Sequence, residues 1–372
     1  MPIFDVEHQD RAAALVQRAL FSDRVPHAYI FHGPDGVGKE TFARALTGVL
    51  LCHQPQRVET PDGQPQLHAC GKCHDCDTAR AGTHPDLHLI YRQLIKYHDD
   101  PTVRKRKGRD LGVDVVRQFV IDKVGAKPAR GRAKVFIVRE ADRITPQAQN
   151  ALLKTLEEPP VTTFLILLVS ALDRMLPTIR SRCCLAPFGP LPDEFIVARL
   201  VELQPDVSPE RARLCARFAQ GSLGLALQHA ADQLDEQNDR LIETLQGLPA
   251  KPVAHSVSRL DQQARALATR FAEREPEITE TESVRRGLKT LLSLAATWYR
   301  DVLHACVASK GLTANVAYAR KITAAAGKTT PERLIEMIRQ LTESESQLDA
   351  NVNLKLCLDA LIIRLSRLSG SQ

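Results

Sequence analysis

The chain has 372 residues, of which 44% are hydrophobic and 25% are charged, and its formal net charge is +6. This length exceeds one ordinary hydrophobic core, and the composition is typical of a soluble globular protein with two or three domains. The mild positive charge permits contact with nucleic acid but does not require it. The N-terminus has no basic-then-apolar leader and no apolar run approaches the length of a membrane span, so we expect neither a secretory signal nor a membrane segment.

Helix and strand patterns alternate through the first half of the chain. Their periodicities predict helices at 10–21, 39–51, 113–124 and 145–157, and strands at 28–32, 86–91, 133–138 and 162–169. Elements of this length in this order predict an α/β fold, with a parallel sheet and helices on both of its faces. We expect an expanded loop at 55–68. After Pro187 the pattern is of amphipathic helices only, with breaks at 247–252 and 273–283.

A glycine-rich loop follows the first predicted strand. Gly33, Gly36, Gly38 and Lys39 have the spacing of a P-loop, whose backbone N–H groups and lysine hold phosphate at a helix N-terminus. The next residue should carry a hydroxyl group that ligates Mg²⁺, but here it is a glutamate. A carboxylate about 5 Å from a phosphate charge costs roughly 3 kcal/mol at an effective dielectric constant near 20. Glu40 thus stands where the Mg²⁺-ligating hydroxyl group should be. Thr41 completes the degenerate loop, but it lies one position too far round the helix to take that role.

Four of the nine cysteines form a cluster, Cys52, Cys70, Cys73 and Cys76. Without an export signal a disulfide framework is not expected, and four thiolates are the number that a closed structural zinc site requires. An iron–sulfur cluster and disulfides remain the alternatives. The metal would fold this segment and not catalyse a reaction. Three histidines nearby are possible substitute ligands, although solvated side chains are the simpler interpretation: His53, His68 and His74.

Further motifs in the chain resemble those of a known family. The stretch Asn150-Ala-Leu-Leu-Lys-Thr-Leu-Glu-Glu-Pro159 is followed, at a strand's distance, by Ser181-Arg182-Cys183, and the C-terminal region holds Trp298-Tyr-Arg-Asp301 and Asn351-Val-Asn353. With the P-loop and the cysteine cluster, this ordered set resembles the AAA+ subunits of bacterial DNA polymerase III clamp loaders, most of all their delta-prime branch. The resemblance covers nearly the whole chain.

The resemblance implies three domains and a set of partners. We expect a RecA-like AAA+ domain at 1–187 with a zinc module at 52–76, a three-helix lid at 188–246 and a helical collar at 253–372. Through the collar, the chain would join gamma/tau-like and delta-like subunits in a cytoplasmic ring of five. Such a ring places the sliding clamp on primer–template DNA, and the delta-prime branch acts in it as a stator without a working ATPase site.

The other nucleotide-handling motifs are degenerate as well. Working relatives end the strand that carries the acidic motif with Asp-Glu, whereas this chain has Arg139 and Glu140. Working relatives also carry an arginine where Gly224 stands, and the first sensor position is at best Ser170. We therefore expect no intrinsic hydrolysis. Binding of a nucleotide without turnover, and a loop kept only as a structural turn, both stay open.

Ser181 and Arg182 are the residues that we expect to take part in chemistry, at a neighbour's site. In the family this arginine projects towards the γ-phosphate of ATP on the adjacent ATPase subunit. A guanidinium suits that role because it is always charged and can donate several hydrogen bonds to phosphate oxygens. The alternative is a surface arginine that caps a carbonyl group.

Two other classes of protein compete with a non-catalytic subunit. One is an active gamma/tau-like ATPase of the same ring, which Glu40, Arg139 and Gly224 all oppose. The other is a stand-alone zinc-dependent nucleic-acid binder, which leaves the degenerate P-loop and the collar helices unexplained. The basic run 104–109 is compatible with phosphate contact in the loader, but a solvated loop is the simpler interpretation.

Overall fold

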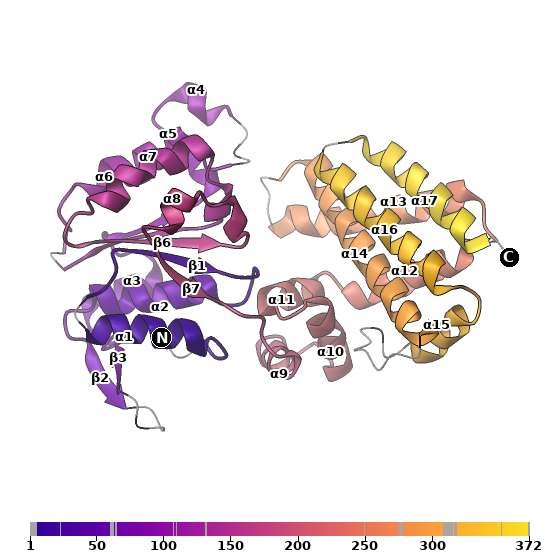
Figure 1. Cartoon of the computed structure of the whole chain (residues 1–372), viewed down its shortest axis with the longest axis horizontal. Coiled ribbons are helices and arrows are strands. Elements are labelled where there is room, and N and C mark those ends of the chain that lie inside the picture. Colours follow the sequence, from indigo (N-terminus) through magenta and orange to yellow (C-terminus); the bar gives the residue numbers. More distant parts are fainter. Residues whose placement is uncertain are drawn as a thin grey trace. The chain divides into compact units, whose positions relative to one another are not determined.

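The computed structural model describes residues 6–22, 24–59, 63, 65–106, 108, 110–130, 132–248, 250–274, 278–307, 315, 318–350 and 352–370. The chain forms two compact units, Met1–Pro192 with Gly221–Gly224, and Asp193–Gln220 with Leu225–Gln372 (Figure 1). Within the described ranges no helix has both the length and the apolar character needed to cross a membrane. Lys107, Arg109 and Asn351, which belong to motifs noted above, lie outside these ranges.

The first unit is built on a five-stranded sheet in the order β4-β5-β6-β1-β7. All neighbouring strands are parallel. Their bounds are β1 Ala28–His32, β4 Leu87–Ile90, β5 Lys134–Val138, β6 Thr163–Val169 and β7 Cys184–Pro187. The four predicted strands are confirmed to within a residue or two, whereas β7 was not predicted. This sheet with helices on both faces confirms the RecA-like α/β fold.

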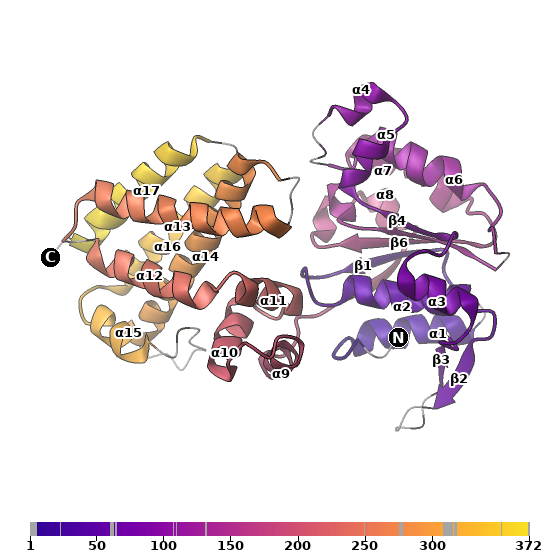
Figure 2. The ribbon, with the colours of Figure 1, turned by 180° about the vertical axis from the view of Figure 1, so that it is seen from behind.

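Helices cover the two faces of the sheet (Figures 1 and 2). They are α1 Asp10–Phe21, α2 Lys39–Leu51, α3 His74–Ala81, α4 Pro101–Arg104, α5 Val113–Val116, α6 Asp122–Val124, α7 Pro146–Glu157 and α8 Pro177–Arg180. α1, α2 and α3 lie on one side of the sheet, and α5 to α8 lie on the other. The predicted helix at 113–124 is present, with a π-helical stretch at Arg117–Ile121 between α5 and α6.

Successive residues of β1 point to opposite faces of the sheet and pack against the helices on each face. Ile30 belongs to an apolar cluster with residues of α5 and α7. Phe31 points to the opposite face, where its ring lies 5.4 Å from Phe42 of α2 and 5.3 Å from Phe188. A strand with both faces buried holds the loop that follows it in a fixed position, and that loop is the P-loop.

The prediction of an expanded loop at 55–68 is wrong over most of that range. Residues there form an antiparallel hairpin, β2 Gln56–Glu59 and β3 Pro65–His68. Gln17 of α1 fixes this hairpin to the unit, because its side chain donates to the Leu67 carbonyl at 3.2 Å and accepts from the Leu67 N–H at 2.9 Å. Every residue of β2 is exposed. The sequence therefore has no alternation of apolar residues that would predict this strand.

Among its described residues the second unit has helices and no strand, and the first two residues of its α11 belong to the first unit. Its helices are α9 Asp193–Leu203, α10 Pro209–Phe218, α11 Leu223–Ala231, α12 Leu234–Gly247, α13 Val253–Arg274, α14 Glu280–Cys306, α15 Ala319–Ala326, α16 Pro331–Asp349 and α17 Leu354–Gly370. Trp298 is 2% exposed in the apolar core of this unit. A buried polar link joins α12 to α14, because Asn315 accepts from Asn238 at 2.8 Å and donates to Asp301 at 2.8 Å.

Candidate functional site

The P-loop lies between β1 and the N-terminus of α2, where the sequence predicted it. Gly33, Gly36 and Gly38 all have positive φ angles, of 147°, 72° and 100°, a backbone region that only glycine adopts without strain. Gly38 is the residue before the first turn of α2. The glycine spacing therefore corresponds to a real conformational requirement of this loop.

Lys39 is folded back onto its own loop. Its ammonium group donates to the carbonyl of Gly33 and to that of Pro34 at 2.7 Å, and it lies 3.4 Å from the Asp35 carboxylate and 3.3 Å from the Ser170 hydroxyl. The lysine is 7% exposed. Burial lowers the pKa of Lys39, and the neighbouring Asp35 carboxylate opposes that shift.

Glu40 and Arg139, which stand in place of the expected hydroxyl group and of the first acidic residue of working relatives, form an ion pair. Arg139 Nε donates to Glu40 Oε2 at 2.8 Å, and Arg44 Nε donates to Glu40 Oε1 at 2.9 Å. Burial alone would raise the pKa of Glu40, but the two guanidinium groups outweigh it and lower that pKa. Glu40 is thus a charged partner of Arg139. Thr41 follows it in the first turn of α2 and is half-buried.

Glu140, the remaining carboxylate of the acidic motif, is also engaged. Arg92 donates to both of its carboxylate oxygens, at 2.6 and 3.0 Å, and Arg143 lies 3.4 Å away. In a working site this carboxylate would orient the attacking water. Two arginines compete for its lone pairs here, so this geometry does not leave it free to act as a base.

Gly224, at the place of the missing lid arginine, touches the P-loop. Its N–H donates to the Gly36 carbonyl at 3.0 Å. A Cβ atom added at Gly224 would lie 2.9 Å from the Gly36 Cα, which is closer than ordinary van der Waals contact. The segment Gly221–Gly224 belongs to the first unit. A side chain at position 224 would therefore obstruct this backbone contact with the P-loop.

The four clustered cysteines converge on one point. Their sulfur atoms all lie within 4.8 Å of one another, and the Sγ atoms of Cys70 and Cys76 are 3.8 Å apart. Tetrahedral zinc with Zn–S bonds of about 2.3 Å places its sulfurs about 3.8 Å apart. All four are free thiols, and this set can hold a metal such as zinc. The backbone N–H of Lys72 lowers the pKa of Cys70 to about 6, whereas burial raises the pKa values of Cys52 and Cys76.

These four sulfurs come from three pieces of chain. Cys52 follows the last residue of α2, Cys73 caps the N-terminus of α3, and Cys76 lies inside α3. Cys70 follows the hairpin. A fully occupied set of four leaves no open position for a substrate, as in structural sites. Of the predicted substitute ligands, His53 contacts Asp75 and His68 contacts Gln66.

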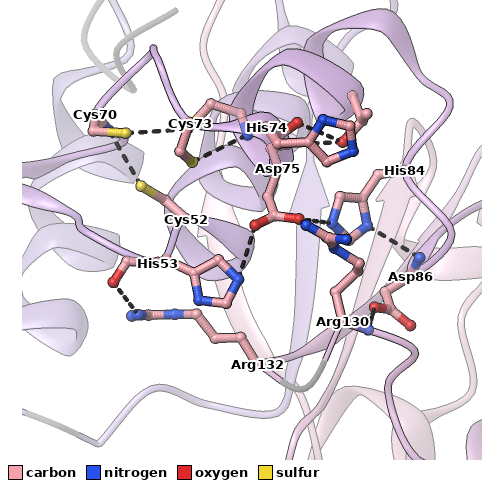
Figure 3. Close-up of polar contacts among 12 residues, drawn as sticks. Cys52, His53, Cys70, Cys73, His74, Asp75, His84, Asp86, Arg130 and Arg132 are labelled. Atoms are coloured by element: carbon pink, nitrogen blue, oxygen red, sulfur yellow. Dashed lines mark hydrogen bonds and ion pairs between the residues drawn. The ribbon is translucent and has the colours of Figure 1, made fainter.

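A buried aspartate ties this cysteine cluster to the sheet, and the sequence interpretation missed it (Figure 3). Asp75 is 2% exposed and contacts His53 Nε2 at 2.8 Å, His84 Nε2 at 3.2 Å and Arg130 Nε at 2.9 Å. Burial would raise the pKa of Asp75, but the hydrogen bonds from Arg130 and His84 lower it. Asp86, just before β4, accepts from the Arg130 N–H at 2.8 Å. Through Arg130 and His84, Asp75 therefore links α3 to the segment that leads into β4.

Arg182 lies just beyond the C-terminal end of α8, and its side chain is 36% exposed. Its Nη2 lies 2.6 Å from Glu157 Oε1, and its Nη1 donates to the Thr178 carbonyl at 3.1 Å. Ser181 also donates to the Thr178 carbonyl, at 3.1 Å. In the single chain the arginine therefore packs on α7 and α8, and caps a carbonyl as the simpler interpretation expects.

Comparison with known proteins decides the family. The model of the family described as DNA polymerase III, delta subunit, matches residues 8–192. DNA polymerase III subunit delta' of Pseudomonas aeruginosa is 30% identical over 249 residues, which are 64% of this chain and 68% of that protein. The chain belongs to the delta-prime family of DNA polymerase III subunits.

Another delta-prime protein matches over almost its full length. DNA polymerase III subunit delta' of Bacillus subtilis (strain 168) is 28% identical over 359 residues, 96% of each chain. Among solved structures, a gamma subunit-related protein of DNA polymerase III from Thermotoga maritima has a TM-score of 0.42 and 17% identity, and covers 97% of this chain and 100% of that one.

Replacing one cysteine should remove the metal. We expect Cys76→Ser to lose about one bound zinc ion per chain, because a tetrahedral site with three thiolates binds far more weakly. Its melting temperature should fall by several degrees, since each 1 kcal/mol shifts a unit of this size by about 2–4 °C. Metal analysis and thermal denaturation measure both effects. Cys306→Ser, in the other unit, should keep its metal. Wild-type protein that contains no zinc after zinc-replete, reducing purification would contradict the assignment.

The contact between Gly224 and Gly36 predicts a steric cost. Gly224→Ala should lower the free energy of unfolding by about 1–3 kcal/mol, because the new methyl group meets backbone that must move. Gly125→Ala is the matched control, since a Cβ there has no atom within 4 Å. Urea denaturation compares the two variants. Equal stability would show that the backbone contact is not tight.

Proposed function

We propose that this chain is the non-catalytic, stator-like AAA+ subunit of a DNA polymerase III clamp loader. One observation carries the proposal: Arg139 and Glu40 pair with each other where a working subunit would hold magnesium. A cation fixed at the metal position opposes a divalent ion by Coulomb repulsion. The chain would thus be a component of a DNA-directed DNA polymerase holoenzyme, without ATPase or polymerase activity of its own.

Both alternative functions are weaker. An active gamma/tau-like ATPase needs the magnesium ligands and a free carboxylate to orient water, whereas Glu140 is held by Arg92 and Arg143. A stand-alone zinc-dependent nucleic-acid binder would use its metal module for contact with phosphate. Here the module's buried aspartate, Asp75, is directed into its own unit, towards Arg130 and His84, which supports a structural role for zinc.

The proposed partners follow from membership of the family. Gamma/tau-like and delta-like subunits would bind through the collar at 253–372, next to a lid at 188–246, in a cytoplasmic ring that acts on the sliding clamp and primer–template DNA. Ser181 and Arg182 would face the ATP of a neighbouring subunit. What supports this is the position of Arg182 beyond a short helix, with a partly exposed side chain, and the guanidinium chemistry that favours a developing phosphate charge.

The arginine finger predicts a loss of activity in trans. In a reconstituted loader, Arg182→Ala should cut ATP turnover at the adjacent site by about 10³-fold or more, while the variant chain keeps the wild-type melting temperature. Arg174→Ala, which removes another exposed arginine of the same unit, should leave turnover unchanged. Steady-state ATPase assays of the whole ring with primed DNA and clamp measure the effect. Unchanged turnover in the Arg182→Ala ring would refute the finger.

Glu157 needs its own control in that assay. Its carboxylate pairs with Arg182 in the single chain. Glu158, the next residue, is exposed as Glu157 is and serves as the matched position. If the finger acts in trans, Glu157→Gln should alter ring turnover only when Arg182 is present, and Glu158→Gln should not alter it. An equal effect of both glutamine variants would indicate a general change in surface charge.

A further inference from the structure

A carboxylate from the P-loop itself contacts two of the side chains that would meet a phosphate in a working site. Asp35 accepts a hydrogen bond from the Ser170 hydroxyl and lies 3.4 Å from the Lys39 ammonium group. In a working site the P-loop lysine reaches the outer phosphates, and the polar residue after the sheet strand faces the same group. Asp35 therefore bridges the two side chains that a terminal phosphate would bridge.

Lys39 and Arg139 each have a carboxylate partner at this site without any ligand. Lys39 is paired with Asp35, and Arg139 is paired with Glu40. A working site differs, because its lysine binds phosphate and its acidic groups bind a divalent metal. Here one carboxylate supplies the charge of the phosphate, and one guanidinium supplies the charge of the metal.

The two ion pairs differ in how easily a ligand can displace them. The Asp35 side chain is 87% exposed, so solvent screens its attraction to Lys39 and this pair is the easier of the two to displace. Arg139 and Glu40 are 38% and 32% exposed, and Arg44 gives Glu40 a second partner. An incoming anion would therefore displace Asp35 first and leave the cation at the metal position in place.

We infer that the P-loop is a self-occupied anion site, in which Asp35 takes the place of a phosphate. Its ligand class is a metal-free di- or triphosphate, because Arg139 already occupies the position of the magnesium ion. This inference concerns the chain's own pocket and does not depend on the arginine finger that faces a neighbour.

Removal of the Asp35 charge tests the inference. Titration calorimetry in magnesium-free buffer without a chelator, with inorganic pyrophosphate and with ATP as probes, should show that Asp35→Asn binds at least about tenfold more tightly than the wild-type chain. Lys39→Ala in the Asp35→Asn background should abolish the gain. Asp173→Asn is the matched control, because it removes the same charge from an exposed site of the same unit and should bind as the wild type does.

The effect of Mg²⁺ on the affinity distinguishes this site from a working nucleotide site. Repeating the titrations with excess Mg²⁺ should leave the affinity of Asp35→Asn equal or weaker. The inference is overturned if Asp35→Asn binds neither probe more tightly than the wild type, or if Mg²⁺ tightens binding about tenfold. Either result leaves the ring ATPase assay of Arg182→Ala unaffected, so failure here is separable from failure of the proposed function.

Discussion

The ion pair between Glu40 and Arg139 sets the chemistry of the P-loop. Glu40 begins α2 and Arg139 follows the end of β5, so the pair spans the carboxyl edge of the sheet where the nucleotide of a working subunit would lie. Each residue alone would harm the site, one by repelling phosphate and the other by repelling metal. Together they neutralise each other, and this explains how the fold keeps both substitutions.

The same unit holds a cluster of four cysteines that could bind a metal and that is fixed by other contacts. Four cysteine sulfurs come together at the ends of α2 and α3, while Asp75 fastens α3 to Arg130 and His84 beneath them. Because α2 starts at the P-loop and ends at Cys52, a metal at its C-terminal end would help to fix a helix whose N-terminal end carries Glu40. Such bracing would suit the fixed, non-catalytic role that we propose.

The sequence predicted the regular elements well because their apolar patterns are strong. The bounds of α1, β1 and α2 agree with the expected ranges, and the sheet follows from alternation of helices and strands. β7 was missed because Cys184–Pro187 is four residues long and ends in proline, a pattern that does not indicate a strand. The partners of Glu40 and Asp75 could not be predicted either, since Arg139 is 99 residues from Glu40 and Arg130 is 55 residues from Asp75. Such pairs depend on strand order, which local patterns do not encode.

The measurement that tests this account most directly is ATP turnover by the purified chain alone, with Mg²⁺ and with Mn²⁺. The account predicts no turnover above that of a Lys39→Ala control at any metal concentration, because Arg139 pairs with Glu40 and Glu140 is held by Arg92 and Arg143. Metal-dependent hydrolysis that Lys39→Ala abolishes would contradict it, and would make this chain an active ATPase of the ring.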